Sequence, residues 1–130
     1  MNIKLKLPNI SLYVFGVYCI LQALIFTFFI ESMAPQFFNT TPEGLEIVVL
    51  MHYGMAPAFL IMGLTGLFAT TFELQSKRKV ILAFIIGYIP LFVAFNYFIE
   101  SEVMNAGVET FIPDFICFIL GLIAYFTSSK

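Results

Sequence analysis

Hydrophobic residues in this chain form four long runs that are separated by short polar segments. We predict helices over about residues 10–30, 43–73, 79–100 and 110–127. A bilayer core of about 30 Å takes roughly 20 helical residues, so each run can span it, and the second run must tilt, kink or reach the headgroups. The pattern predicts an all-α polytopic membrane protein, a four-transmembrane-helix bundle that forms a single domain over residues 1–130.

The connection between the first two predicted helices contains a helix start signal. Thr41, Pro42 and Glu43 supply an N-cap, a proline at the first helical position and an acid in the first turn. Residues 32–41, with Pro35 and two phenylalanines, are predicted to form a loop that lies on the outer membrane surface.

The basic N-terminal segment MNIKLKL leads into an apolar run and could be confused with a signal peptide. That run of about 20 residues is longer than the apolar region of a signal peptide. The one small-x-small cleavage candidate, Ser32-Met33-Ala34, is followed by Pro35. We therefore expect the run to be kept as the first spanning helix.

Composition supports a membrane location. The 130 residues are 61% hydrophobic and 11% charged, whereas soluble domains are about half apolar and a quarter charged. A soluble fold of this length could not bury so much apolar surface, so the expected partner is the lipid bilayer. The net charge is −2, and the only basic cluster is Lys77-Arg78-Lys79, which argues against nucleic acid as a partner.

The charged residues divide between the two sides of the predicted bundle. The basic side carries Lys4, Lys6, Lys77, Arg78, Lys79 and Lys130, and the opposite side carries Glu31, Glu43, Glu46, Glu100, Glu102 and Glu109. By the positive-inside rule, both termini and the loop at residues 73–79 are cytoplasmic. We predict a multi-pass protein of the cell's inner (cytoplasmic) membrane with the N-terminus and C-terminus inside.

Common catalytic and metal motifs are missing from the sequence. Cys19 and Cys117 lie far apart in apolar runs without a C-x-x-C pair, so we expect two buried, inert thiols. A single histidine with scattered acids is not a recognisable zinc or copper set. No G-x-S-x-G or serine–histidine spacing occurs. No cofactor is indicated, and an enzyme is the least favoured class.

Small and polar residues recur at helical spacing on each predicted helix, which marks faces suited to helix contact. The four stripes are Tyr18, Cys19 and Gln22; His52, Ala56, Phe59, Gly63, Gly66 and Thr70; Ala83, Gly87, Pro90, Ala94 and Tyr97; and Asp114, Cys117, Gly121 and Ala124. We expect these four faces to point into the bundle.

Four polar side chains, one from each helix, fall at similar depth in the outer half of the bilayer: Gln22, His52, Asn96 and Asp114. They predict a hydrated pocket that opens outward, with Tyr53 and Tyr97 as further walls. Pro57 frees the carbonyl of Tyr53 beside the histidine. The expected carboxylate partner of His52 is Asp114 first and Glu46 second.

Each of these residues also has a purely structural interpretation. Asp114 is placed where an acid favours a helix start, and Gln22 and Asn96 suit interhelical hydrogen bonds. His52 fits a hydrogen-bonded structural role and a functional one equally well, because ionisable residues in membranes are rare and tend to mark sites. These alternatives stay open at the level of sequence.

The second run contains the small-residue stretch HYGMAPAFLIMGLTGLF, and the basic turn KRK and two further apolar runs follow it. This layout resembles the DoxX-like group of small bacterial four-helix membrane proteins. The resemblance implies a four-helix fold, and some members of that group are quinone-linked oxidoreductase subunits. It transfers no individual residue.

The leading functional hypothesis is a small integral membrane protein whose outer-leaflet pocket binds a small lipophilic ligand, quinone-like or lipid-like, or relays protons. Its ligand-binding residues would be His52, Asp114, Tyr53, Gln22, Asn96 and Tyr97. The alternative is a non-catalytic interaction or assembly subunit. Its small-residue helix faces would pack against a second copy or a partner membrane subunit.

Overall fold

The computed structural model describes the backbone of residues 3–128 and the side chains of residues 6–128. The chain is all-α, and its elements are α1 (Ile3–Phe28), α2 (Ile30–Phe37), α3 (Pro42–Ala69), α4 (Leu74–Glu100), the 3-10 helix η1 (Val108–Phe111) and α5 (Ile112–Thr127). Four apolar helical stretches are long enough to cross a membrane: Lys6–Phe28, Pro42–Ala69, Leu74–Glu100 and Val108–Thr127. The predicted all-α fold with four spanning helices is confirmed.

The segment predicted as an outer loop is largely helical instead. The backbone leaves the helix at Phe29, and α2 then continues to Phe37. The Ser32 hydroxyl donates to the Phe29 carbonyl at 2.9 Å, which satisfies a carbonyl at the break. Ile30 and Ala34, four residues apart, are both buried on one side of α2. This buried face explains why residues 30–37 form a helix rather than a loop.

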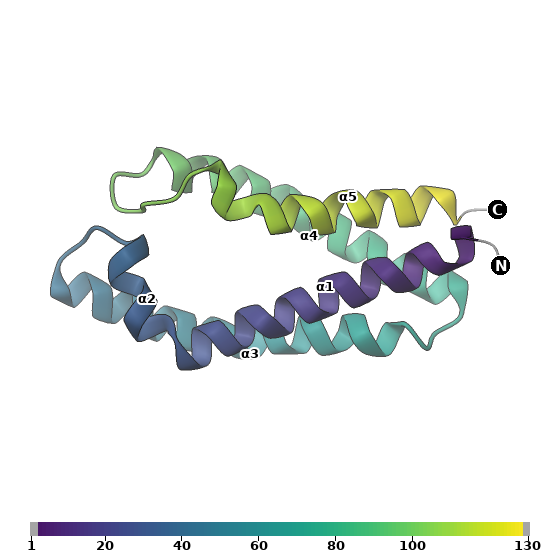
Figure 1. The fold of residues 1–130 in the computed structure, drawn as a ribbon, viewed down its shortest axis with the longest axis horizontal. Coiled ribbons are helices and arrows are strands. Elements are labelled where there is room, and N and C mark those ends of the chain that lie inside the picture. Colours follow the sequence, from purple (N-terminus) through teal and green to yellow (C-terminus); the bar gives the residue numbers. More distant parts are fainter. Residues whose placement is uncertain (1–2, 129–130) are drawn as a thin grey trace.

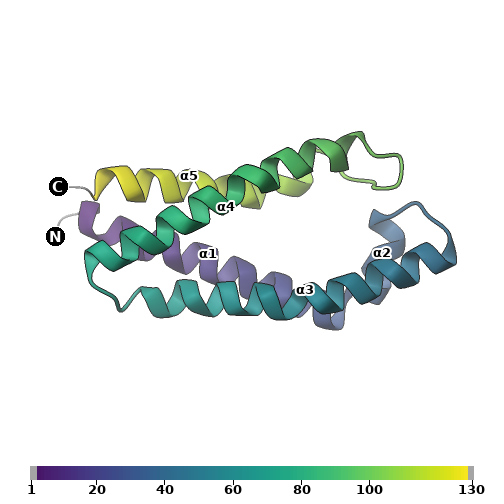
Figure 2. The same ribbon diagram turned by 180° about the vertical axis from the view of Figure 1, so that it is seen from behind.

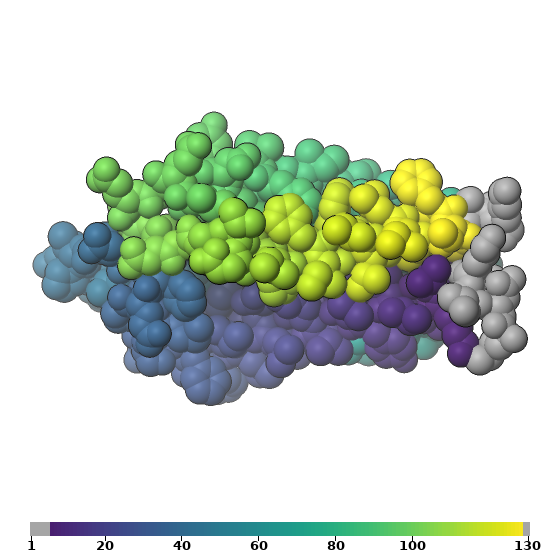
Figure 3. Space-filling view, turned by 45° about the horizontal axis from the view of Figure 1, so that its top comes forward, coloured from purple at the N-terminus to yellow at the C-terminus, as the bar shows by residue number. Residues whose placement is uncertain are grey.

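The long helices form two hairpins, α1 with α3 and α4 with α5. The two hairpins meet at one end of the molecule (Figures 1 and 2). Both termini and the α3–α4 turn lie at that end, whereas α2 and the α4–η1 connection lie at the other. The most extensive contact is between α1 and α3, and α3 touches α4 only slightly. Figure 3 shows α5 lying between α1 and α4, in contact with both. α3 and α4 are therefore loosely packed although they follow one another in the chain.

Glycines bring the backbones of α1 and α3 close together. A Cβ added to Gly63 would lie 2.8 Å from the Gly16 carbonyl oxygen, closer than real Cβ atoms approach. A Cβ on Gly66 would lie 3.2 Å from the Gly16 Cα. Small residues permit such close approach in membranes, where van der Waals packing drives helix association. The expectation that Gly63 and Gly66 form a helix contact is confirmed.

The small-residue stripe predicted for α4 is not the buried, helix-contacting face of that helix. Ala83, Gly87 and Pro90 on that stripe are exposed, and the buried residues of α4 are large ones: Ile81, Ile85, Tyr88 and Phe95. Aromatic stacking explains the choice, since the ring of Phe95 stacks on Phe111 at 3.8 Å between centroids. Exposure of apolar residues to lipid costs little, so the face of α4 that is buried is the one with the larger packing area.

The stripe of α5 is buried as predicted, and it includes Asp114, Cys117, Gly121 and Ala124. This face of α5 lies against α1 and α4. Cys19 of α1 is buried too, so the expectation of two buried thiols is confirmed.

A short backbone pairing joins the two hairpins at the end away from the termini. The Asn39 N–H donates to the Val103 carbonyl at 2.7 Å, and the Asn105 N–H donates to the Phe37 carbonyl at 2.8 Å. We refer to residues 37–39 and 103–105, which make this isolated antiparallel bridge, as the clasp. It connects the α2–α3 and α4–η1 segments where the helices themselves diverge.

Charge separates along the long axis of the molecule. Lys6, Lys77, Arg78 and Lys79 belong to the end with the termini, whereas most acids, including Glu43 and Glu102, belong to the end with the clasp. The side chain of Lys4 and residue Lys130, both used in the orientation prediction, lie outside the described residues. The inside position of both termini stays a prediction.

Candidate functional site

A cavity of about 290 Å³ lies between α1, α3 and α4, with one wall residue from α5. Its lining is mainly apolar and aromatic: Phe15, Tyr18, Cys19, Phe59, Met62, Ala83, Phe84, Gly87, Tyr88, Leu91 and Asp114. The single charged group in this lining is the carboxyl of Asp114. The cavity occurs where α4 separates from α3, so it follows directly from the unequal packing of the two hairpins.

A chain of hydrogen bonds forms the polar wall of the cavity. The Tyr18 hydroxyl donates to Asp114 Oδ2 at 2.9 Å, and Gln22 Nε2 donates to the Tyr18 hydroxyl at 2.9 Å. Tyr18 and Gln22 are one helical turn apart on α1, so both project from the same face. Asp114 exposes 9% of its surface. This Gln22–Tyr18–Asp114 chain connects the first and last spanning helices.

The chain lies deep in the bundle. Helical rise puts Tyr18 roughly 18 Å from Lys6 and roughly 15 Å from Phe28, the two ends of the first span. Asp114 reaches this depth because the fourth span is short and Phe111, buried against Phe95, sets where α5 begins. The start of α5, with Pro113 in its first turn, therefore aims a carboxyl group at the middle of α1.

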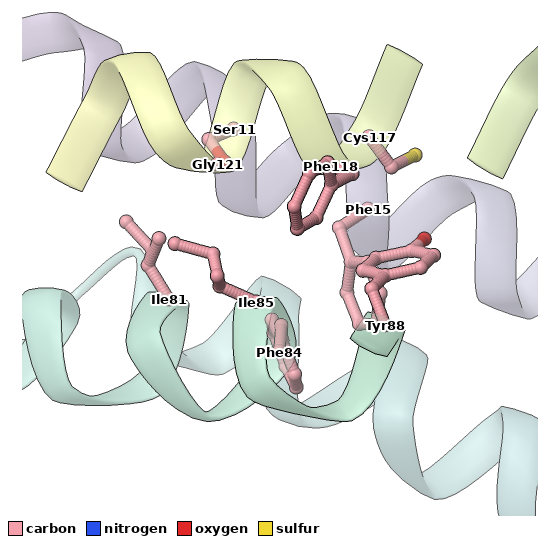
Figure 4. A pocket seen from close by; sticks show the side chains of 9 residues that line it. All are labelled: Ser11, Phe15, Ile81, Phe84, Ile85, Tyr88, Cys117, Phe118 and Gly121. Carbon is pink, nitrogen blue, oxygen red and sulfur yellow. The ribbon is translucent and has the colours of Figure 1, made fainter. Parts of the chain in front are cut away.

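A second, much smaller void of about 10 Å³ lies beside the cavity and shares Phe15, Phe84 and Tyr88 with it. Figure 4 shows these rings together with Phe118, and it shows the Tyr88 hydroxyl and the Cys117 sulfur on the same side. A space of that size holds one water molecule at most. The ligand-sized space is therefore the larger cavity.

His52 does not pair with either carboxylate that the sequence suggested. Its Nδ1 lies 2.7 Å from the Val48 carbonyl oxygen one turn earlier on α3, so Nδ1 carries the proton and donates. The ring packs edge-on against Phe26, with 4.7 Å between centroids, and more distantly against Phe38. The hydrogen bond of Asp114 comes from Tyr18 instead. These contacts place His52 at the α1–α2–α3 junction, outside the lining of the cavity.

Three other predicted site residues also lie away from the cavity. The Tyr53 hydroxyl donates to Glu31 Oε1 at 2.8 Å and so ties α3 to α2. Asn96 is exposed on α4, and Tyr97 exposes 71% of its surface. Of the six predicted residues, Asp114 lines the cavity and Gln22 lies one hydrogen bond behind it.

Sequence reasoning missed Tyr18 and Tyr88 as members of the site. Both tyrosines lie in the middle of long apolar runs, well away from the interfacial positions where tyrosine is common. A hydroxyl at that depth needs a hydrogen-bond partner, and this requirement was the available signal. The four-residue spacing of Tyr18 and Gln22 was visible, but the partner of Tyr18 on α5 is 96 residues away in the chain.

Among the described residues, no group of three or more His, Cys, Asp or Glu side chains could hold a metal ion. The arrangement therefore offers a carboxyl, hydroxyls and aromatic rings as its chemistry. Comparison of the chain with family models, curated proteins and solved structures finds no match. The membrane-spanning fold and the geometry of the cavity are what point to a function.

Proposed function

We propose that this integral membrane protein binds a small lipophilic molecule in the cavity beside Tyr18 and Asp114. The observation that supports the proposal is a ligand-sized space with a few placed polar groups. Its volume of about 290 Å³ is close to the lower bound of about 300 Å³ for ligand pockets. Its walls are apolar except for the hydrogen-bonded side of Tyr18 and Asp114.

The open face of α4 supports entry of the ligand from the bilayer. Ala83 and Gly87 line the cavity and are exposed, and nothing lies within 4 Å of a Cβ added to Gly87. Because α3 and α4 barely touch, a lipophilic molecule can reach this space between them from the lipid phase.

The alternative of an assembly subunit is less well supported. Gly63 and Gly66, the small residues expected to recruit a partner helix, are occupied by α1 of the same chain. Proton relay is also less well supported, because the hydrogen-bonded chain ends at Gln22, whose amide does not titrate. The DoxX-like resemblance and the inner-membrane location with both termini inside stay predictions.

A cavity-filling variant tests the proposal. We choose three probes with one phenylalkyl body: 4-phenylbutylamine, 4-phenylbutan-1-ol and 4-phenylbutan-2-one. Binding is measured by equilibrium dialysis against protein in lipid nanodiscs, with protein-free nanodiscs as the partition background. We expect Gly87→Leu to abolish saturable binding of whichever probes the wild type takes, because the leucine fills the space.

Gly54→Leu is the matched control. Gly54 also has nothing within 4 Å of an added Cβ, but it does not line the cavity. This variant adds the same side chain to an open helix face and should bind the probes like the wild type. Saturable binding that is equal in the wild type and Gly87→Leu, or is absent for all three probes, would overturn the proposal.

A further inference from the structure

We infer that the cavity selects a lipophilic amine in its cationic form, with Asp114 as the counter-charge, over an acceptor-only molecule such as a quinone. This inference rests on the proposed function and names the ligand class of the same site. Three independent observations carry it: the balance of hydrogen-bond donors and acceptors at the polar wall, the charges that line the cavity, and its aromatic lining.

The polar wall has spare acceptors and few spare donors. The single hydroxyl hydrogen of Tyr18 is donated to Asp114 Oδ2, and its oxygen already accepts from Gln22. A carboxylate offers about four acceptor positions, and the Tyr18 hydroxyl and the backbone N–H of Asp114 fill two of them. A ligand that donates hydrogen bonds therefore finds partners on Asp114, whereas a ligand carbonyl finds no free hydroxyl on Tyr18.

The remaining groups of the lining do not change this balance. The Cys19 thiol is a weak donor, and the Tyr88 hydroxyl interacts with Cys117 rather than standing free. Among the described residues that line the cavity, none is Lys, Arg or His. Buried acids in membranes are normally paired, so the position beside Asp114 suits a cation that the ligand brings.

The helix dipole stabilises a charged carboxylate at Asp114, which is in the first turn of α5, and burial of the group opposes that charge until a cation lies beside it. Five aromatic side chains line the same cavity: Phe15, Tyr18, Phe59, Phe84 and Tyr88. A desolvated cation is attracted to aromatic faces as well as to a carboxylate, and the apolar body of the ligand fits the rest of the lining.

The three probes test this inference because they share one body and differ in the polar group. The amine is a charged donor, the alcohol is a neutral donor, and the ketone only accepts. In wild-type protein, we expect the amine to bind at least about tenfold more tightly than the ketone after correction for partition, since charge-assisted hydrogen bonds are the stronger ones. The alcohol should fall between them.

Asp114→Asn should weaken binding of the amine about tenfold and leave the affinity for the ketone unchanged, because the charged acceptor is lost while the shape is kept. Glu46→Gln is the matched control, since it removes the same charge from an exposed position outside the cavity. It should leave all three affinities unchanged. If Asp114→Asn does not fold, the order of the three probe affinities on wild-type protein still tests the inference.

The inference is overturned if the ketone binds as tightly as the amine, or if Asp114→Asn retains the full affinity for the amine. Either result can occur while Gly87→Leu still abolishes binding, and the proposed function would then survive with a different ligand class. Loss of the amine preference is therefore distinguishable from failure of the cavity as a binding site.

Discussion

Gly63 of α3 and Gly87 of α4 belong to similar small-residue stripes, yet they have opposite surroundings. A Cβ on Gly63 would meet the backbone of α1 at 2.8 Å, whereas a Cβ on Gly87 would meet nothing within 4 Å. The first glycine lies in the most extensive helix contact among the described residues, and the second lies on the wall of the cavity of about 290 Å³. A small-residue stripe thus marks a place where something can approach closely, and a ligand can take the place of a helix.

The two hairpins differ in the same way. The α1–α3 contact uses small residues that allow backbone approach, while α4 meets α5 through large rings such as Phe92 and Phe115, which stack at 4.7 Å. α4 is packed on α5 and hardly touches α3, and the space between α3 and α4 is part of the cavity. Asp114 and Tyr18 then join the hairpins at the edge of the cavity.

The largest effect should come from filling the tight contact. We expect Gly63→Leu to lower the free energy of unfolding by about 3 kcal/mol, because no rotamer avoids the α1 backbone. Reversible unfolding in mixed micelles with increasing SDS measures this change. Gly54→Leu is the control and should stay within about 0.5 kcal/mol of the wild type. Equal stability of Gly63→Leu and the wild type would contradict the close contact of α1 and α3.

Tyr18→Phe should have the next largest effect. It removes both hydrogen bonds of the polar wall, and we expect a loss of about 1 kcal/mol in the same unfolding assay. Tyr13→Phe is the matched control, since Tyr13 is exposed on the same helix and should tolerate the change. A loss that is no larger than in Tyr13→Phe would show that Tyr18 does not connect the hairpins.

A substitution in the clasp tests whether this backbone pairing holds the two hairpins together where the helices diverge. Asn105→Pro removes the N–H that donates to the Phe37 carbonyl and should cost about 0.5–1 kcal/mol. Hydrogen exchange should speed up at the Asn39 amide, the other donor of the pairing. Asn105→Ala keeps the backbone donor and should preserve the slow exchange; equally fast exchange in both variants would contradict the pairing.

The smallest effect on stability is expected from Gly87→Leu. The added side chain enters open space, and leucine favours a helix more than glycine does, so stability should stay within about 0.5 kcal/mol of the wild type. The same unfolding assay measures it. A destabilisation as large as that of Gly63→Leu would mean that the α4 face is packed, and the contrast between the two glycines would disappear.

Much of the fold could be predicted from the sequence because membrane spans have a strong local signal. Residues 10–30 and their three counterparts were identified by length and hydrophobicity alone, and the Thr41–Pro42 start of α3 was identified by its cap. The helix at residues 30–37 was missed because its signal is one buried face, Ile30 and Ala34, within a segment that contains a proline. Its stability depends on packing against α1 and α3.

The site was predicted less well, because helical spacing identifies an inward face of a helix without identifying the partners of its side chains. Periodicity put Asp114 on the inward face of its helix correctly, but it could not say which helix that face meets. His52 was matched with Asp114 because both are ionisable and inward-facing, whereas the structure gives His52 a carbonyl of its own helix.

The sequence by itself determined the four spans, the buried stripe of α5, the close-packing glycines of α3 and the division of charge between the two ends. These features follow from hydrophobicity, helical spacing and steric size, which act locally. Only the tertiary structure decided that Tyr18 is the partner of Asp114, that the large face of α4 is buried, and that its small face lines a cavity. In lipid an apolar face gains little from burial itself, so shape complementarity and hydrogen bonds between distant helices decide which faces meet.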